Sequence, residues 1–85
     1  MRLLKYRITD EFGLHARPAG QLVKAMSQFR CNVRIGTPAK MVDAKRILGV
    51  MGLAIKGGEE ILMDFHGEDE AEAYAAAEKT LKECL

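Results

Sequence analysis

The stretch LLKYRITDEFGLHARPAGQLVKAMSQF, residues 3–29, changes its hydrophobic period halfway along. Up to Thr9, apolar residues alternate with charged ones, which predicts a half-buried strand. From Ala16 onward, apolar residues recur at helical spacing, and Pro18 suits a first turn because no amide hydrogen is needed there. The stretch therefore predicts a strand, a loop over residues 10–13, and a helix that begins beside His15.

The segments that follow also have recognisable periods. Alternation over residues 31–35 and 41–44 predicts two short strands, with a turn containing glycine and proline between them. Residues 46–55 are largely apolar and predict a short helix, weakened by about 1 kcal/mol for each of its two glycines. Alternation over residues 61–65 predicts a fourth strand after the Gly57-Gly58 turn.

The last segment predicts a helix that begins after Asp69. Glu72 follows three positions later, which predicts a capping box. The expected buried stripe of this helix is Ala71, Tyr74, Ala75, Leu81 and Leu85. The resulting order, β-α-β-β-α-β-α, favours an α+β sandwich with helices over one face of a sheet.

Length and composition limit the classes of protein. Eighty-five residues allow one domain, and 48% hydrophobic with 29% charged residues argue for a folded chain. We find neither an apolar run long enough to span a membrane nor a signal peptide. Cys31 and Cys84 lie far apart, with no metal-ligand pattern involving His15 or His66. We expect a soluble cytoplasmic domain, residues 1–85, without metal or cofactor.

Charge is distributed unevenly along the chain. Residues 1–56 carry a net charge of about +8 and residues 57–85 about −7. A basic first part indicates an anionic ligand or an acidic partner. Alternatively, the acids only decorate one solvated helix near the C-terminus.

The segment GLHARPAG, residues 13–20, contains the residues best suited to bind a ligand or take part in a reaction. Gly13 permits a bend, and His15 lies where free amides and the positive helix dipole attract an anion. Arg17 adds donors that suit a phosphate, and a histidine there can accept a phosphoryl group. The alternative is that His15 only caps the helix or is half-buried.

This segment resembles the active centre of the HPr family, the histidine-containing phosphocarriers of the bacterial phosphoenolpyruvate:sugar phosphotransferase system. VDAKRILGVMGLAIKGG (residues 42–58) and GEDEAEA (residues 67–73) are similar to two further blocks of that family. The resemblance thus covers the whole chain. It implies an open-faced β-sandwich, in which three helices cover one side of a four-stranded antiparallel sheet.

The resemblance also implies a function. Nδ1 of His15 would accept a phosphoryl group from enzyme I and pass it to enzyme IIA domains, while Arg17 contacts the phosphate. Such a protein is a monomeric carrier with a transient phosphohistidine rather than a turnover catalyst. The residues that match or extend the docking surface of the family are Lys24, Lys45, Arg46, Ile47, Leu48 and Met51.

Two positions depart from the family pattern. Many members have a serine, the target of a regulatory kinase, where this chain has Arg46, and a small polar residue where it has Phe12. An alternative function is a regulator of the same fold that docks to an enzyme or transcription factor, although His15 and Arg17 disfavour it. A nucleic-acid module is disfavoured because the aromatic residues lie mostly on buried phases. We expect His66 at the surface and Cys31 in the core.

Overall fold

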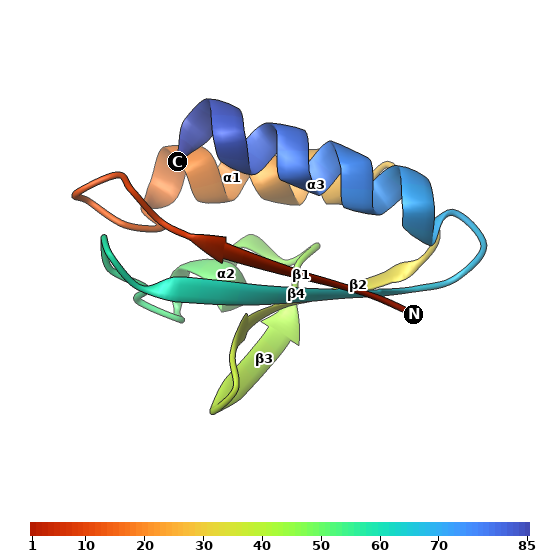
Figure 1. The fold of residues 1–85 in the computed structure, drawn as a ribbon, viewed down its shortest axis with the longest axis horizontal. Coiled ribbons are helices and arrows are strands. Elements are labelled where there is room, and N and C mark those ends of the chain that lie inside the picture. Colours follow the sequence, from red (N-terminus) through yellow and green to blue (C-terminus); the bar gives the residue numbers. More distant parts are fainter.

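The computed structural model describes residues 1–85, and its seven elements follow the predicted order. Their bounds are β1 Arg2–Arg7, α1 Ala16–Met26, β2 Asn32–Thr37, β3 Lys40–Asp43, α2 Ile47–Met51, β4 Glu60–His66 and α3 Glu70–Cys84. The strands form one antiparallel sheet in the order β1-β4-β2-β3. Helices α1 and α3 lie side by side over one face of it (Figure 1), and α2 packs against α1 and β3. The predicted open-faced α+β architecture is confirmed. No helix is both long and apolar enough to cross a membrane.

The core lies between the sheet and the helices, and the alternation of the strands explains it. On β4, Ile61, Met63 and Phe65 are fully buried. Cys31, just before β2, is also buried, as predicted. The apolar stripe of α1 contributes its buried side chains Ala19, Leu22 and Met26 to the same core. On the open face, the one buried charge is Asp64, which accepts hydrogen bonds from Nε and Nη2 of Arg34.

The predicted helix over residues 46–55 is too long. Helix α2 ends at Met51, and the chain then turns through Ala54, whose φ is +53°. After this turn the backbone contacts the loop before α1, where the amide of Leu14 donates a hydrogen bond to the carbonyl of Ile55 at 2.9 Å. This tertiary contact, together with Gly52 after the last turn, stops the helix early.

The predicted capping box of α3 is also wrong. Asp69 occupies the N-cap position without a side-chain cap, and its carboxylate accepts hydrogen bonds from the amides of Arg30 (2.8 Å) and Cys31 (2.9 Å). The carboxylate therefore holds the segment before β2 rather than the helix. The buried stripe is also shifted, since Ala71 and Ala75 are exposed and the buried residues are Ala73, Ala77, Leu81 and Leu85.

Asp69 makes the stability of the fold depend on pH. The hydrogen bond from the Arg30 amide, with those at Cys31, lowers the pKa of Asp69. Because its folded pKa lies below the unfolded one, Asp69 adds stability above the unfolded value, and this is lost as pH falls through the folded value. At neutral pH we expect Asp69→Asn to unfold at a lower urea concentration than wild type. The difference between the two midpoint concentrations should become smaller in acid. Glu68→Gln, an exposed neighbour, is the control. A difference for Asp69→Asn that is constant across pH would contradict this account.

Candidate functional site

His15 is presented by a loop that packs tightly against the segment before β4. Gly13 has φ +68°, and a Cβ there would lie 2.2 Å from the carbonyl oxygen of Ile55. The next residue, Leu14, is buried and donates its amide to the same carbonyl. The backbone on the N-terminal side of His15 is thus anchored, while the His15 side chain remains 40% exposed.

His15 is the N-cap residue of α1, and its backbone is extended (φ −88°, ψ −175°). Its carbonyl accepts the amide of Ala19 at 3.0 Å, but its side chain does not cap the helix, so the alternative of a capping histidine is wrong. The other part of that alternative is correct, because His15 is half-buried. The amides of Ala16 and Arg17 make no backbone hydrogen bond, and Pro18 has no amide hydrogen. Two donors and the positive end of the helix dipole are therefore available to an anion beside the imidazole.

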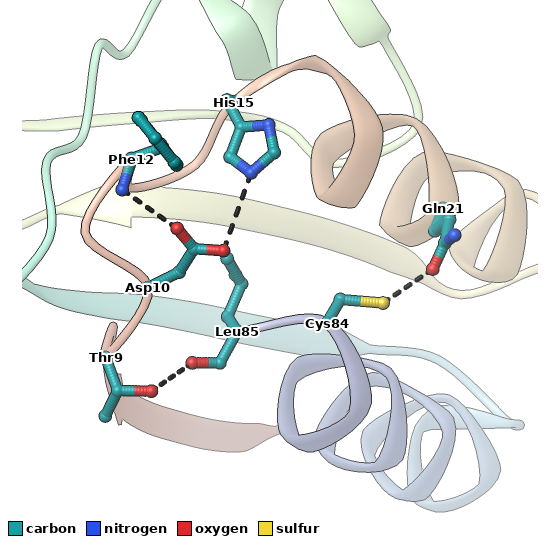
Figure 2. Close-up of polar contacts among 7 residues, drawn as sticks. All are labelled: Thr9, Asp10, Phe12, His15, Gln21, Cys84 and Leu85. Atoms are coloured by element: carbon teal, nitrogen blue, oxygen red, sulfur yellow. Dashed lines mark hydrogen bonds and ion pairs between the residues drawn. The ribbon is translucent and has the colours of Figure 1, made fainter.

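The imidazole lies in a hollow of ≈ 290 Å³ between the start of α1 and the end of α3. None of the four ion pairs of the chain involves Arg17, which is exposed at this hollow. At its far side, Sγ of Cys84 donates to Oε1 of Gln21 at 2.5 Å, which links the two helices (Figure 2). The lining residues are Asp10, His15, Arg17, Pro18, Gln21, Glu83 and Cys84. The structure thus brings together His15 and Arg17 as expected.

Four residues of the hollow were missed by the sequence reasoning: Asp10, Gln21, Glu83 and Cys84. Gln21 lies on α1 itself, four positions after Arg17, so helical spacing alone could have placed it beside the site. Glu83 and Cys84 have no local signal, because they reach the hollow only through the packing of α3 on α1. Asp10 has one, since an aspartate that opens a loop commonly accepts the amide two residues later. It does so here with Phe12 at 2.8 Å, and its other oxygen lies 3.6 Å from Nε2 of His15.

The predicted apolar docking residues are on the surface of α2. Leu48 is 83% exposed, Met51 41% and Ile47 37%, whereas Val50 on the same helix is fully buried. Phe12, whose ring meets the His15 imidazole edge-on, is 72% exposed and adds apolar surface that the sequence reasoning did not assign to docking. An exposed apolar group of this kind is typical of an interaction site.

The three predicted basic docking residues differ in their surroundings. Lys24 is exposed in the last turn of α1, and the Arg46 side chain is 81% exposed, 3.6 Å from Asp43. Lys45, by contrast, donates its ammonium to the carbonyls of Phe29 (2.6 Å) and Cys31 (2.7 Å). Its ammonium thus holds the segment before β2 and is less available to a partner.

The structure contains no group of three or more His, Cys, Asp or Glu side chains that could hold a metal ion. Burial, followed by the hydrogen bond and charge of Asp69, raises the pKa of Cys31 to about 11. This thiol is therefore protonated at neutral pH and acts as a core residue. His66 is exposed, as predicted.

Comparison with known proteins agrees with this geometry. The family model described as the PTS HPr component phosphorylation site matches residues 4–83. The phosphocarrier protein HPr of Lysinibacillus sphaericus is 40% identical over 98% of this chain and 94% of its own. Among solved structures, the histidine-containing phosphocarrier protein of Mycoplasma has a TM-score of 0.93 at 39% identity, covering 96% of this chain and 93% of its own.

A second kind of relative also superposes on the chain. Crh, the catabolite-repression protein of Bacillus subtilis, has a TM-score of 0.76 at 35% identity, with 98% of this chain and 95% of its own covered, and its structure is described as a domain-swapped dimer. The exposed histidine at the start of α1, the four-stranded open sheet and matches over nearly the full length agree on one assignment. The chain belongs to the HPr family of phosphocarrier proteins of the phosphotransferase system.

Proposed function

We propose that the whole chain acts as one cytoplasmic carrier domain that receives a phosphoryl group from enzyme I on His15 and delivers it to enzyme IIA. The observation that supports this most strongly is the half-exposed imidazole of His15 beside the free amides of Ala16 and Arg17. An exposed site suits a carrier because both donor and acceptor must reach the same nitrogen.

The transfer needs only groups that surround the imidazole. The lone pair of Nδ1 attacks the phosphorus of the donor, the N–P bond forms, and the donor's bond to phosphorus breaks with its electrons remaining on the donor. The Arg17 guanidinium and the two amides donate to the phosphoryl oxygens. Delivery reverses these steps, with a nucleophile of the acceptor attacking the same phosphorus.

The experiment that tests delivery isolates the phosphorylated protein, free of enzyme I, and mixes it with enzyme IIA domains. We expect label to leave this protein and appear on the enzyme IIA domain in equal amount. A protein that is labelled but transfers nothing, and instead binds an enzyme or transcription factor, would support the alternative of a regulator. The likeness to Crh is the observation that favours that alternative.

We also propose that the carrier is a monomer, because several partners must approach the same surface. Size-exclusion chromatography with light scattering distinguishes a monomer from the dimer described for Crh. A stable dimer at low concentration would contradict this part of the proposal.

Docking is expected to depend on the exposed residues of α2 and on positive charge beside them. Leu48→Ala should weaken binding to enzyme I, and association should slow as salt rises, since charges are screened beyond about 10 Å at 0.1 M salt. Lys24→Glu should slow association several-fold at low salt. Lys5→Glu, on the open face of the sheet, makes the same charge change away from the site. Equal rates for both variants, or rates independent of salt, would contradict the electrostatic part.

Arg46 offers a test of stability. It is the N-cap residue of α2 and makes no side-chain cap. A serine could accept a free amide hydrogen, so we expect Arg46→Ser to stabilise the fold by about 0.5–1.5 kcal/mol, or several degrees of melting temperature. The exposed ion pair with Asp43 contributes little. Arg46→Ala, which removes the charge without adding a cap, is the control. The capping argument fails if the melting temperature of Arg46→Ser does not exceed that of Arg46→Ala.

The same position bears on regulation. Arginine has no hydroxyl, so we propose that this carrier escapes control by an HPr serine kinase and stays competent for transfer. With such a kinase and ATP, we expect wild type to take no acid-stable label, whereas Arg46→Ser provides an acceptor. Stoichiometric acid-stable labelling of wild type would contradict this proposal.

A further inference from the structure

The imidazole of His15 has two neighbours that belong to the loop before α1. Oδ2 of Asp10 lies 3.6 Å from Nε2 of His15, and the ring of Phe12 meets the imidazole edge-on, with centroids 6.0 Å apart and planes at 78°. The opposite nitrogen, Nδ1, lies on the side of the first turn of α1 (Figure 2). The two nitrogens of the ring thus face different surroundings.

The position of the Asp10 carboxylate is set by several contacts. Its Oδ1 accepts the amide of Phe12 at 2.8 Å, and its main-chain carbonyl accepts the amide of Gly13 at 3.0 Å. The facing segment approaches closely, since a Cβ on Gly57 would lie 2.5 Å from that carbonyl oxygen. Just before it, both the hydroxyl and the amide of Thr9 donate to the carbonyl of Leu85. The loop is therefore anchored on both sides of the carboxylate, whose Oδ2 is left for His15.

We propose that Asp10 is a positioning residue for the phosphoryl transfer of His15. Its carboxylate accepts the Nε2–H of the imidazole and so leaves the lone pair on Nδ1, facing the free amides of Ala16 and Arg17. In neutral imidazole only one nitrogen carries a hydrogen, and the hydrogen bond made by one nitrogen decides the state of the other. The assignment of Nδ1 as the carrying atom rests on the proposed function.

Asp10 is assigned this role because the other side chains around the ring are not placed to accept a hydrogen bond from Nε2. Phe12 has no polar side-chain atom, and Arg17 is a cation that can only donate. Glu83 also lines the hollow, but neither of its carboxylate oxygens lies within 4.0 Å of an imidazole nitrogen, whereas Oδ2 of Asp10 does. A separation of 3.6 Å is longer than a hydrogen bond, and such contacts commonly shorten when a reacting group binds.

The test compares Asp10→Asn with Glu11→Gln. An asparagine keeps an oxygen that accepts the Phe12 amide, so the loop is retained, but it places an NH₂ donor opposite Nε2. This favours the tautomer with hydrogen on Nδ1, which has no lone pair there to attack phosphorus. Glu11→Gln removes the same charge from an exposed neighbour and makes no contact with the imidazole in the structure.

Two readouts decide the outcome. At alkaline pH, where imidazole is neutral, the ¹⁵N shifts of the His15 ring should show hydrogen on Nε2 in wild type and Glu11→Gln, with a shift toward Nδ1–H in Asp10→Asn. Phosphorylation of Asp10→Asn by enzyme I should be slower by about tenfold at an unchanged melting temperature, and that of Glu11→Gln unchanged.

Unchanged tautomer populations and rates in Asp10→Asn would overturn the proposal. Should the melting temperature fall, Asp10→Glu supplies the second comparison, since a carboxylate that still reaches Nε2 restores the wild-type tautomer. Failure of the proposed function looks different: wild type itself would take no phosphate, while the tautomer readout, which needs no enzyme I, would still decide whether Asp10 positions the ring.

Discussion

Replacing His15 by alanine is expected to abolish phosphorylation by enzyme I and phosphoenolpyruvate. No other side chain of the chain combines a nucleophilic nitrogen with the free amides at the start of α1, because His66 lies at the exposed C-terminal end of β4. The label on His15→Ala should fall to background while its melting temperature stays close to that of wild type, since the side chain is 40% exposed.

Two further variants make this result specific. His66→Ala should be labelled at the wild-type rate. Arg17→Ala should be labelled about ten- to hundredfold more slowly, because a hydrogen bond to a charged group contributes about 1.5–3 kcal/mol. Labelling of His15→Ala to the wild-type extent would contradict the assignment, and unchanged kinetics in Arg17→Ala would remove Arg17 from the mechanism.

Alanine at Gly13 is expected to have the largest effect on stability of the changes considered. The residue has φ +68°, and its Cβ would meet the main chain of Ile55 and Lys56 at 2.2 and 2.7 Å. A left-handed alanine costs about 1–2 kcal/mol, and the overlap with backbone adds about 1–3 kcal/mol. The loss of about 2–5 kcal/mol is a large part of the stability of an 85-residue domain.

Gly20 supplies the matched control within the same helix-loop segment. It lies inside α1, and a Cβ there would meet nothing within 4 Å. Gly20→Ala should therefore stabilise the protein by about 0.5–1 kcal/mol through helix propensity alone. Thermal or urea unfolding of the two variants measures both effects. Equal changes in the free energy of unfolding of Gly13→Ala and Gly20→Ala would show that the close approach of residue 13 to Ile55 does not matter for stability.

Much of the fold could be predicted from the sequence because strong local periods coincide with buried faces. The strand residues Ile61, Met63 and Phe65 recur at every second position, and in the structure all three face the core. In α3 the alanines are so frequent that the period hardly distinguishes one face from another. Its true stripe depends on how α3 packs on α1, which no local pattern encodes.

Two charged side chains make contacts that no local motif predicts. Asp69 and Lys45 are surface residues by type, yet each holds backbone groups from a segment far away in sequence: the Arg30 and Cys31 amides for Asp69, the Phe29 and Cys31 carbonyls for Lys45. A local motif predicts a local partner. Backbone groups left unpaired by tertiary structure can compete for the same side chain, and in both cases they do.

The residues of the candidate site were also only partly predictable from the sequence. His15 and Arg17 lie within one short motif and could be proposed from the sequence, whereas Glu83 and Cys84 meet them only because two helices pack together. The anchoring of the Asp10 loop by Gly13 and Gly57 likewise depends on contacts between distant segments.

The central claim, that this chain carries one phosphoryl group on His15, is tested most directly by the intact mass of wild type after incubation with enzyme I and phosphoenolpyruvate. The account predicts that the mass rises by one phosphate per chain only when both are present, and that mild acid reverses the gain, as an N–P bond requires. Fragmentation of the modified protein should place the phosphate on His15. No gain in mass with an enzyme I that phosphorylates another HPr, or a gain that survives acid, would contradict it.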